Sequence, residues 1–99
     1  LLRDSEILYF QYSNENRCWN MILTNMKQHR LRLSTKARDI LNLHPSFIRI
    51  NTDCILNIDY LSSIENSTLR CILYAPFNNL ELIASRRHYS KIKEALKLL

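Results

Sequence analysis

The residues best suited to binding chemistry are the basic ones in the run Arg86-Arg87-His88, which follows Ser85 near the C-terminus. Apolar side chains recur every three or four positions from Tyr89 to Leu99, which predicts an amphipathic helix with Ser85 as its N-cap. Cations in the first turn of a helix oppose its dipole and cost about 0.3–1 kcal/mol. A phosphate group reverses that cost, because a helix N-terminus binds anions and arginine also pairs with guanine. The run therefore indicates contact with a nucleic acid, although arginines that simply extend into water have the same pattern.

No group of residues in the sequence has the pattern of a catalytic site. Glycine is absent, whereas average composition gives about seven in such a chain, so phosphate-binding and dinucleotide-binding loops are excluded. Ser85 and His88 lack an orienting third group, and the nine acidic residues are scattered. We expect neither an enzyme nor a cofactor. We expect His88 to meet a phosphate or a base edge, or simply to be exposed, rather than to act as a general base.

Three cysteines, Cys18, Cys54 and Cys71, lie in apolar stretches without a CxxC pair. An odd number at such positions is typical of buried thiols in a reducing compartment, so we expect a cytoplasmic protein. A zinc site would need four converging ligands, and the cysteines and histidines have no such spacing, so no metal is expected. The longest apolar run, Cys71–Ala75, has five residues, far fewer than the ~20 of a membrane span.

The formal net charge of +5 is concentrated in two segments. Lys27–Arg38 holds five basic residues and no acid, and the segment from Ser85 to Leu99 holds five basic residues and one acid. Clustering of this kind is the pattern of a polyanion-binding protein, although a solvated basic surface has the same composition. The Lys27–Arg38 cluster has no contact assigned to it from the sequence.

Short strands are predicted ahead of the terminal helix, and the last two of them form a hairpin around Phe77-Asn78-Asn79. Ser34 or Thr35 can cap a short helix, Lys36–Leu41, that ends before His44-Pro45. The strands follow from alternating or continuous apolar runs at Ile7–Phe10, Trp19–Leu23, Arg30–Ser34, Phe47–Ile50, Ile55–Ile58, Leu69–Ala75 and Leu80–Ala84.

Without glycine, the tight turns between strands are predicted to use asparagine, which tolerates left-handed backbone angles better than most residues. These elements indicate one mainly β domain over residues 1–99. Because the chain begins with Leu1, we expect it to have been cut from a longer protein. The asparagines expected in turns are Asn14, Asn16, Asn66, Asn78 and Asn79.

Three stretches of the chain together resemble the LytTR family of DNA-binding domains. The run FIRINTDCILNIDYL, from Phe47 to Leu61, resembles the family's central signature, F-x-R-I-H-R-S-x-x-V-N followed by an aliphatic residue. Ile7–Phe10 is similar to the opening strand, and Ile83–Arg87 (IASRR) is similar to the segment before the terminal helix. The stretches occur in the family's order over nearly the whole chain.

The resemblance implies an elongated stack of small antiparallel sheets with one short helix and a C-terminal amphipathic helix. It also implies the output domain of a bacterial response regulator, preceded by a receiver or other signalling domain under a sensor kinase. Such domains read duplex DNA through two loops in successive major grooves and a central loop at the minor groove between them. We expect paired repeat sites, no membrane contact, and an isolated domain that is monomeric or weakly dimeric.

Matching positions assign the two outer contacts. Arg17, with Asn16 beside it, corresponds to one major-groove reader, and Arg87 corresponds to the other. Arg86 and Lys91 correspond to phosphate contacts on the same side as Arg87.

The central loop departs from the family pattern. Asn51 and Thr52 fall on this loop, and Asn51-Thr52-Asp53 stands where the family commonly has His-Arg-Ser. The change removes a basic residue and adds a carboxylate near the expected phosphate. Asp53 either weakens binding there or caps the local turn and faces away from DNA.

Two other functions stay open: a small β-type module for RNA or single strands, and a protein-interaction or sensory β module. A platform that stacks single-stranded bases needs exposed aromatic side chains on adjacent strands, whereas Tyr9 and Trp19 are predicted core residues. Duplex binding predicts a steep fall of affinity with salt, and an interaction module predicts little.

Overall fold

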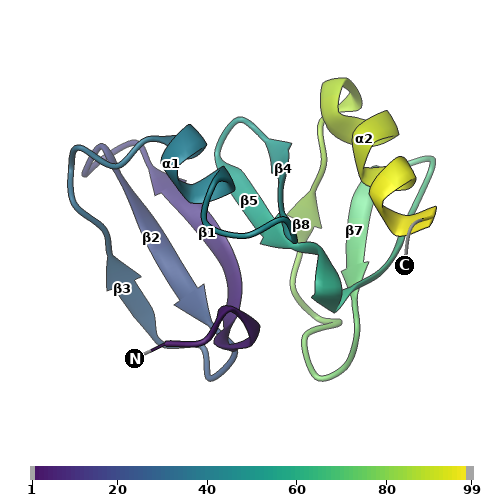
Figure 1. The fold of residues 1–99 in the computed structure, drawn as a ribbon. Helices are drawn as coiled ribbons and strands as arrows, with labels where there is room; N and C mark the ends of the chain where they lie inside the picture. The colour runs from purple at the N-terminus through teal and green to yellow at the C-terminus, as the bar shows by residue number, and fades with distance from the viewer. Residues whose placement is uncertain (1, 98–99) are drawn as a thin grey trace.

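The computed structural model describes residues 2–97 and contains two antiparallel sheets with two α-helices (Figure 1). The larger sheet has the order β3-β2-β1-β5-β4 and the smaller sheet has the order β6-β7-β8. This arrangement confirms the predicted mainly β fold. The elements are β1 Ile7–Ser13, β2 Cys18–Leu23, β3 Gln28–Arg30, α1 Ala37–Leu41, β4 Phe47–Asn51, β5 Cys54–Asn57, β6 Leu61–Ile64, β7 Arg70–Leu73, β8 Leu82–Ile83 and α2 Arg86–Lys97, with 3₁₀ turns at Asp4–Glu6 and Ile58–Tyr60.

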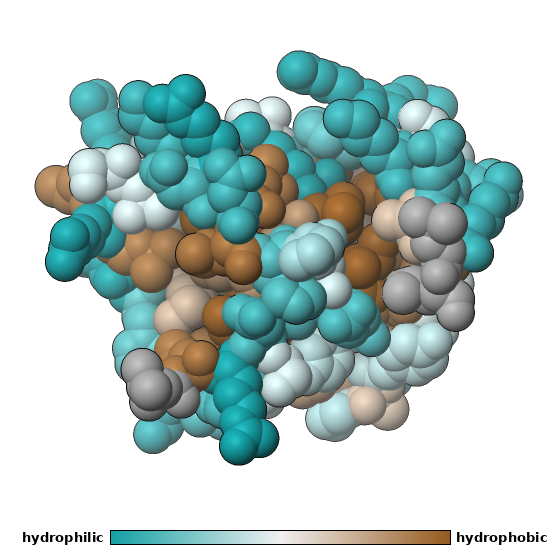
Figure 2. Space-filling view, in the orientation of Figure 1, coloured by the Kyte–Doolittle hydropathy of each residue, from teal (hydrophilic) through white to brown (hydrophobic). Residues whose placement is uncertain are grey.

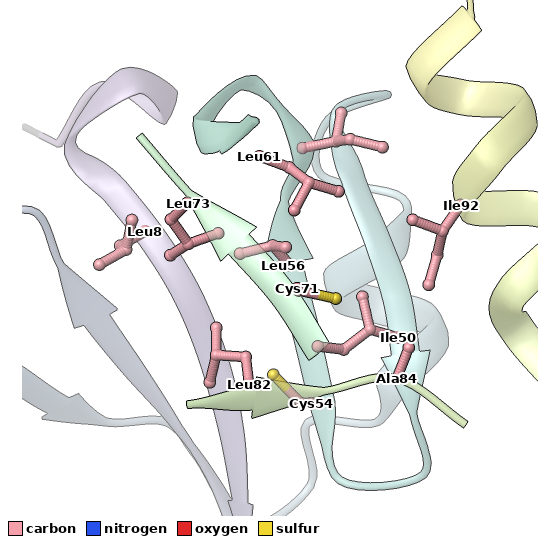
Figure 3. Close-up of a cluster of buried hydrophobic side chains, with 11 residues drawn as sticks. Leu8, Ile50, Cys54, Leu56, Leu61, Cys71, Leu73, Leu82, Ala84 and Ile92 are labelled. Carbon is pink, nitrogen blue, oxygen red and sulfur yellow. The ribbon is translucent and has the colours of Figure 1, made fainter. Parts of the chain in front are cut away.

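The larger sheet is buried on both faces in its middle, and this explains the continuous apolar run of β5. Cys54 and Leu56 point to one face and pack with residues of the smaller sheet and with Ile92 of α2 (Figure 3). Ile55 points to the other face, where it packs with Phe10 and with residues of α1. A strand covered on both faces has no polar side to expose, so alternation is lost there.

The α2 helix closes the first of these two clusters. Ile92 is fully buried, and Leu96 is partly buried against the same cluster. Tyr89 is half-buried, and Leu99, the last residue of the predicted stripe, lies outside the described residues. The amphipathic helix is therefore confirmed over Arg86–Lys97. The hairpin of β7 and β8 is also confirmed, with Arg70 opposite Ile83.

Two predictions around the short helix were wrong. The strand expected over Arg30–Ser34 ends at Arg30, because the chain leaves the sheet and turns, with the N–H of Thr35 donating to the carbonyl oxygen of Arg32 (3.0 Å). The N-cap of α1 is Lys36 rather than Ser34 or Thr35. The carboxylate of Asp39 accepts from the Lys36 N–H (2.8 Å), so the acid of the first turn satisfies that donor.

The prediction that asparagine supplies the left-handed turn positions was also wrong. Among the described residues, positive φ angles occur at Arg17 (53°), Met26 (69°) and Leu69 (62°). Side chains with a Cβ are strained in this region, typically by about 1 kcal/mol or more. The glycine-free chain therefore holds these turns against local preference, through the pairing of the strands on either side.

The three cysteines are buried and free, as expected. Burial raises the pKa of the Cys54 thiol to about 12 and that of the Cys71 thiol to about 11. Both groups are protonated at neutral pH and act as small apolar side chains. Within residues 2–97, the model contains no helix with the length and apolar content needed to cross a membrane.

Candidate nucleic-acid interface

Three turns lie side by side along one edge of the domain, at the top of Figure 1. They are the β1–β2 turn (Asn14–Arg17), the β4–β5 turn (Thr52–Asp53) and the segment that leads from β8 into α2. We call this the three-turn edge. The N–H of Tyr12 donates to the carbonyl oxygen of Asp53 (2.7 Å), which joins the first two turns. The N–H of Ser85 donates to the carbonyl oxygen of Ile50 (2.8 Å), which joins the last two.

The β1–β2 turn holds Asn16 and Arg17, and both side chains are exposed. The Ser13 hydroxyl accepts from the N–H of Asn16 (3.2 Å), which fixes the start of the turn. Arg17 then takes the left-handed conformation and leads into β2, where Ser13 pairs with Cys18. The exposed side chain of Arg17 therefore starts from a backbone angle that the pairing of the two strands imposes.

A groove of about 460 Å³ lies beneath Arg17. Three cationic side chains line it, Arg17, Lys36 and Arg49, and the carboxylate of Asp53 is the one acid among them. Tyr12 and Trp19 form part of the wall and stack edge to face at 5.3 Å between ring centroids. Trp19 is only 3% exposed, so the two rings form the wall of the groove and part of the hydrophobic core, and they do not offer a platform on which bases could stack.

The β4–β5 turn is fixed by Asn51, whose side chain uses both of its polar atoms within the protein. Its Oδ1 accepts from the N–H of Asp53 (2.7 Å), and its Nδ2 donates to the carbonyl oxygen of Ile83 (2.7 Å). Asn51 therefore caps this turn, the role considered for Asp53, and also ties it to β8. The side chain of Thr52 is exposed at the tip.

Arg49 also lies at this edge, although it is not among the site residues predicted from the sequence. Its Nε donates to the carbonyl oxygen of Asn51 (3.3 Å) and its Nη2 donates to that of Thr52. The guanidinium lies 5.9 Å from the ring centroid of Trp19. Arg49 belongs to the FIRIN run, where its polar side chain among apolar neighbours was an available signal. Lys36 was also missed, because nothing in its local sequence separates it from a solvated lysine.

The start of α2 presents Arg86, Arg87 and Lys91 to solvent. His88 is half-buried beside them, and its Nδ1 is 2.7 Å from the hydroxyl of Ser85. Partial burial lowers the pKa of His88, and the positive charge of Arg87, Arg49 and Lys91 lowers it further, in that order. The imidazole is therefore mostly neutral at pH 7 and adds little to the local charge.

The structure thus brings all eight sequence-predicted site residues to the three-turn edge. They are Asn16 and Arg17 on the first turn, Asn51 and Thr52 on the second, and Arg86, Arg87, His88 and Lys91 on α2. In the orientation of Figure 2, hydrophilic side chains gather along this upper rim, and apolar surface appears below it. Across residues 2–97, the one contact within 4 Å between a basic and an acidic side chain joins Nε2 of His44 to Oδ2 of Asp4 (3.6 Å), so the cations of the edge have no acidic partner at that distance.

Comparisons with known proteins show the family of the chain and its fold. The family model described as the LytTr DNA-binding domain matches residues 1–97. The chain belongs to the LytTR family of DNA-binding domains. Among solved structures, it is similar to one described as the LytTr DNA-binding domain of a putative methyl-accepting/DNA response regulator from Bacillus cereus, with a TM-score of 0.72 and 16% identity. The match covers 96% of this chain and 84% of that one. Among curated proteins, none matches the chain.

Membership of the LytTR family accounts for the resemblance of the FIRIN and IASRR runs, and it makes the domain a DNA-binding one. The likeness to the Bacillus cereus domain, at 16% identity, establishes that the two share a fold. The roles of single residues in this LytTR domain stay predictions, made from matching positions in the family pattern.

Proposed function

We propose that this LytTR domain binds duplex DNA sequence-specifically, with the three-turn edge laid along the helix. The observation that carries the proposal is the placement of arginines without an acidic partner at both ends of this edge, Arg17 on the β1–β2 turn and Arg87 on α2, within the described residues 2–97. The long dimension of the domain is 34 Å. Successive major grooves on one face of B-DNA lie one helical turn apart, roughly 34–36 Å. One domain is therefore long enough for its two ends to reach two successive grooves.

The side chains divide into two kinds of contact. Arg17 and Arg87 project freely and offer the bidentate geometry that recognises guanine O6 and N7, so we assign base reading to them. Arg86 and Lys91 are exposed on the same helix, and by their match to the family pattern we assign them to phosphate oxygens. The N-terminus of α2 adds its own attraction for phosphate. Neutral His88 accepts or donates one hydrogen bond beside them.

The β4–β5 turn faces the minor groove between those two ends in this proposal. Thr52 is exposed at its tip and offers a hydroxyl. Asn51 has one amide hydrogen and one lone pair left after its two protein contacts, so its main work is to hold the turn. The carboxylate of Asp53 opens into the groove lined by Arg17 and Arg49, where these cations offset its repulsion of phosphate.

In its full chain, the domain serves as the non-enzymatic output unit of a bacterial transcription regulator in the cytoplasm. The Bacillus cereus domain of the same fold belongs to a putative response regulator. By that analogy, a receiver domain under a sensor kinase controls this one. Dimerisation of the receiver domains then brings two DNA-binding domains together, which favours binding to paired repeat sites. The domain alone is monomeric or weakly dimeric.

The test is a selection of duplexes from a random pool by the wild-type domain, followed by competition gel shifts with the selected site. The selected duplex should compete far better than a random duplex, its own single strand or an RNA of the same sequence. Arg17→Ala and Arg87→Ala should each lower the specific-to-random ratio, by roughly 1–3 kcal/mol for each base contact that the substitution removes. Lys97→Ala removes one charge at the far end of α2 and is the matched control. Equal competition by single strands would support an RNA or single-strand binder and contradict the proposal.

A further inference from the structure

The segment between β3 and α1 carries a cluster of basic residues, and none of them is among the eight assigned site residues. Arg30 ends β3, Arg32 lies in the turn that follows, and Lys36 precedes α1. The side chains of Arg30 and Arg32 are exposed, and Lys36 lines the groove beneath Arg17. Lys27–Arg38 contains five basic residues and no acid. We call residues 30–36 the basic connection.

The basic connection lies against the Arg17 end of the three-turn edge. Its Leu31 N–H donates to the carbonyl oxygen of Trp19 (2.9 Å), and Arg30 is paired with Asn20 of β2. Lys36 lines the same groove as Arg17. Since β3 lies beyond β2 at the edge of the sheet, the connection begins on the far side of β2 from α2 and then returns toward α1, which brings Lys36 to the groove beneath Arg17 (Figure 1).

Local structure does not explain why this connection carries cations. None of its basic side chains meets an acidic side chain within 4 Å among residues 2–97. The one acid of α1 near it, Asp39, accepts from a backbone N–H of Lys36 rather than from its ammonium group. Leu31 packs at the edge of the core, whereas Leu33, in the middle of the connection, is 73% exposed, so no apolar contact fixes the stretch that carries Arg32. Unpaired like charges repel, and an outside polyanion offsets that repulsion.

We propose that the basic connection is a phosphate-binding flank, in which Arg32 and Lys36, with Arg30 beside them, contact the backbone of duplex DNA beside and outside the base pairs beneath Arg17. This inference rests on the proposed function and extends its footprint on one side. Such contacts carry no base information, so they strengthen binding to every duplex equally. They also make the two ends of the footprint unequal, because the described part of α2 has no corresponding segment beyond it.

The experiment compares the double variant Arg32→Gln/Lys36→Gln with the control Lys27→Gln/Lys97→Gln, which removes the same charge. Lys27 precedes β3 at the end of the sheet far from the three-turn edge, where the Leu23 N–H donates to its carbonyl oxygen. Affinity for the selected duplex and for a random duplex is measured over a range of salt concentrations. Removing one phosphate contact lowers the slope of log affinity against log salt by about 0.9, so the slope of the test variant should fall by about 1.8 and that of the control should hardly change.

A second arm shortens the selected duplex one base pair at a time from each end. Wild-type affinity should fall earlier on the Arg17 side, and the Arg32→Gln/Lys36→Gln variant should no longer respond to those outer base pairs. Both proteins should respond alike on the Arg87 side. If test and control variants have the same slopes and the same truncation profiles, the flank is refuted while the proposed function stands. If the wild-type domain shows no preference for a selected duplex, the proposed function fails and the flank fails with it.

Discussion

Replacing Asn51 with alanine removes both hydrogen bonds that hold the central turn of the three-turn edge. These bonds join Oδ1 to the N–H of Asp53 and Nδ2 to the carbonyl oxygen of Ile83, and each is 2.7 Å long. A hydrogen bond of this kind contributes about 1 kcal/mol net, so Asn51→Ala should lower the free energy of unfolding by about 2 kcal/mol. For a domain of this size, that corresponds to a fall in Tm of roughly 8–16 °C. The matched variant is Thr52→Ala, whose exposed side chain is the tip of the same turn.

The assay is urea unfolding of both variants, with affinity for selected and random duplexes measured on the same samples. Asn51→Ala should lose stability and also affinity for both duplexes, since the bond to Ile83 ties this turn to the strand that leads into α2. Thr52→Ala should keep the stability of the wild type within about 0.5 kcal/mol. If Asn51→Ala unfolds at the same urea concentration as the wild type and loses only base preference, Asn51 is a base reader. Its proposed structural role, which is to hold the central turn through these two bonds, is then refuted.

Three further substitutions test the backbone, a titrating group and a buried polar side chain. Arg17→Gly should unfold with a free energy about 1 kcal/mol above that of Arg17→Ala in urea titrations, because glycine adopts a φ of 53° without Cβ strain; equal values would show that the turn is unstrained. The pKa of His88 is lowered by folding, so the unfolded chain takes up its proton first, and stability falls as pH drops below the ordinary value of 6.5. His88→Gln should flatten that part of the stability–pH curve, and an unchanged curve would contradict this. Asn57→Ala leaves the carbonyls of Asp4 and Ile7 without their buried donor and should cost about 2–4 kcal/mol in the same unfolding assay, whereas a cost below about 1 kcal/mol would contradict it.

The sequence predicted best those elements whose apolar pattern directly reflects the faces that they bury. The α2 stripe, the hairpin of β7 and β8 and the buried run of β5 could be predicted because each pattern reflects one or two packed faces. Strand β6 was missed, since Leu61–Ile64 has one buried residue and two serines on its exposed side. Its pairing with β7, across the short connection that follows it, supplies the order that its own side-chain pattern does not indicate.

Turn conformation and long-range contacts were beyond the reach of the sequence. Arg17, Met26 and Leu69 adopt left-handed angles that their own residue types disfavour, so the decisive forces come from paired strands on both sides. Arg49 and Lys36 belong to the edge because folding brings the β4–β5 turn and the basic connection beside Arg17. The bond from Asn51 to Ile83 spans 32 positions and has no signature in either local sequence.

The central claim is that Arg17 and Arg87 read two separate grooves of one duplex, and a base-by-base substitution profile of the selected site tests it most directly. Affinity is measured for every single base-pair change with the wild-type domain, Arg17→Ala and Arg87→Ala. The claim predicts that each variant loses base preference over its own short block of base pairs, and that the two blocks lie about one helical turn apart. Loss of preference over the same block in both variants, or a wild-type profile without preference in either block, would contradict it.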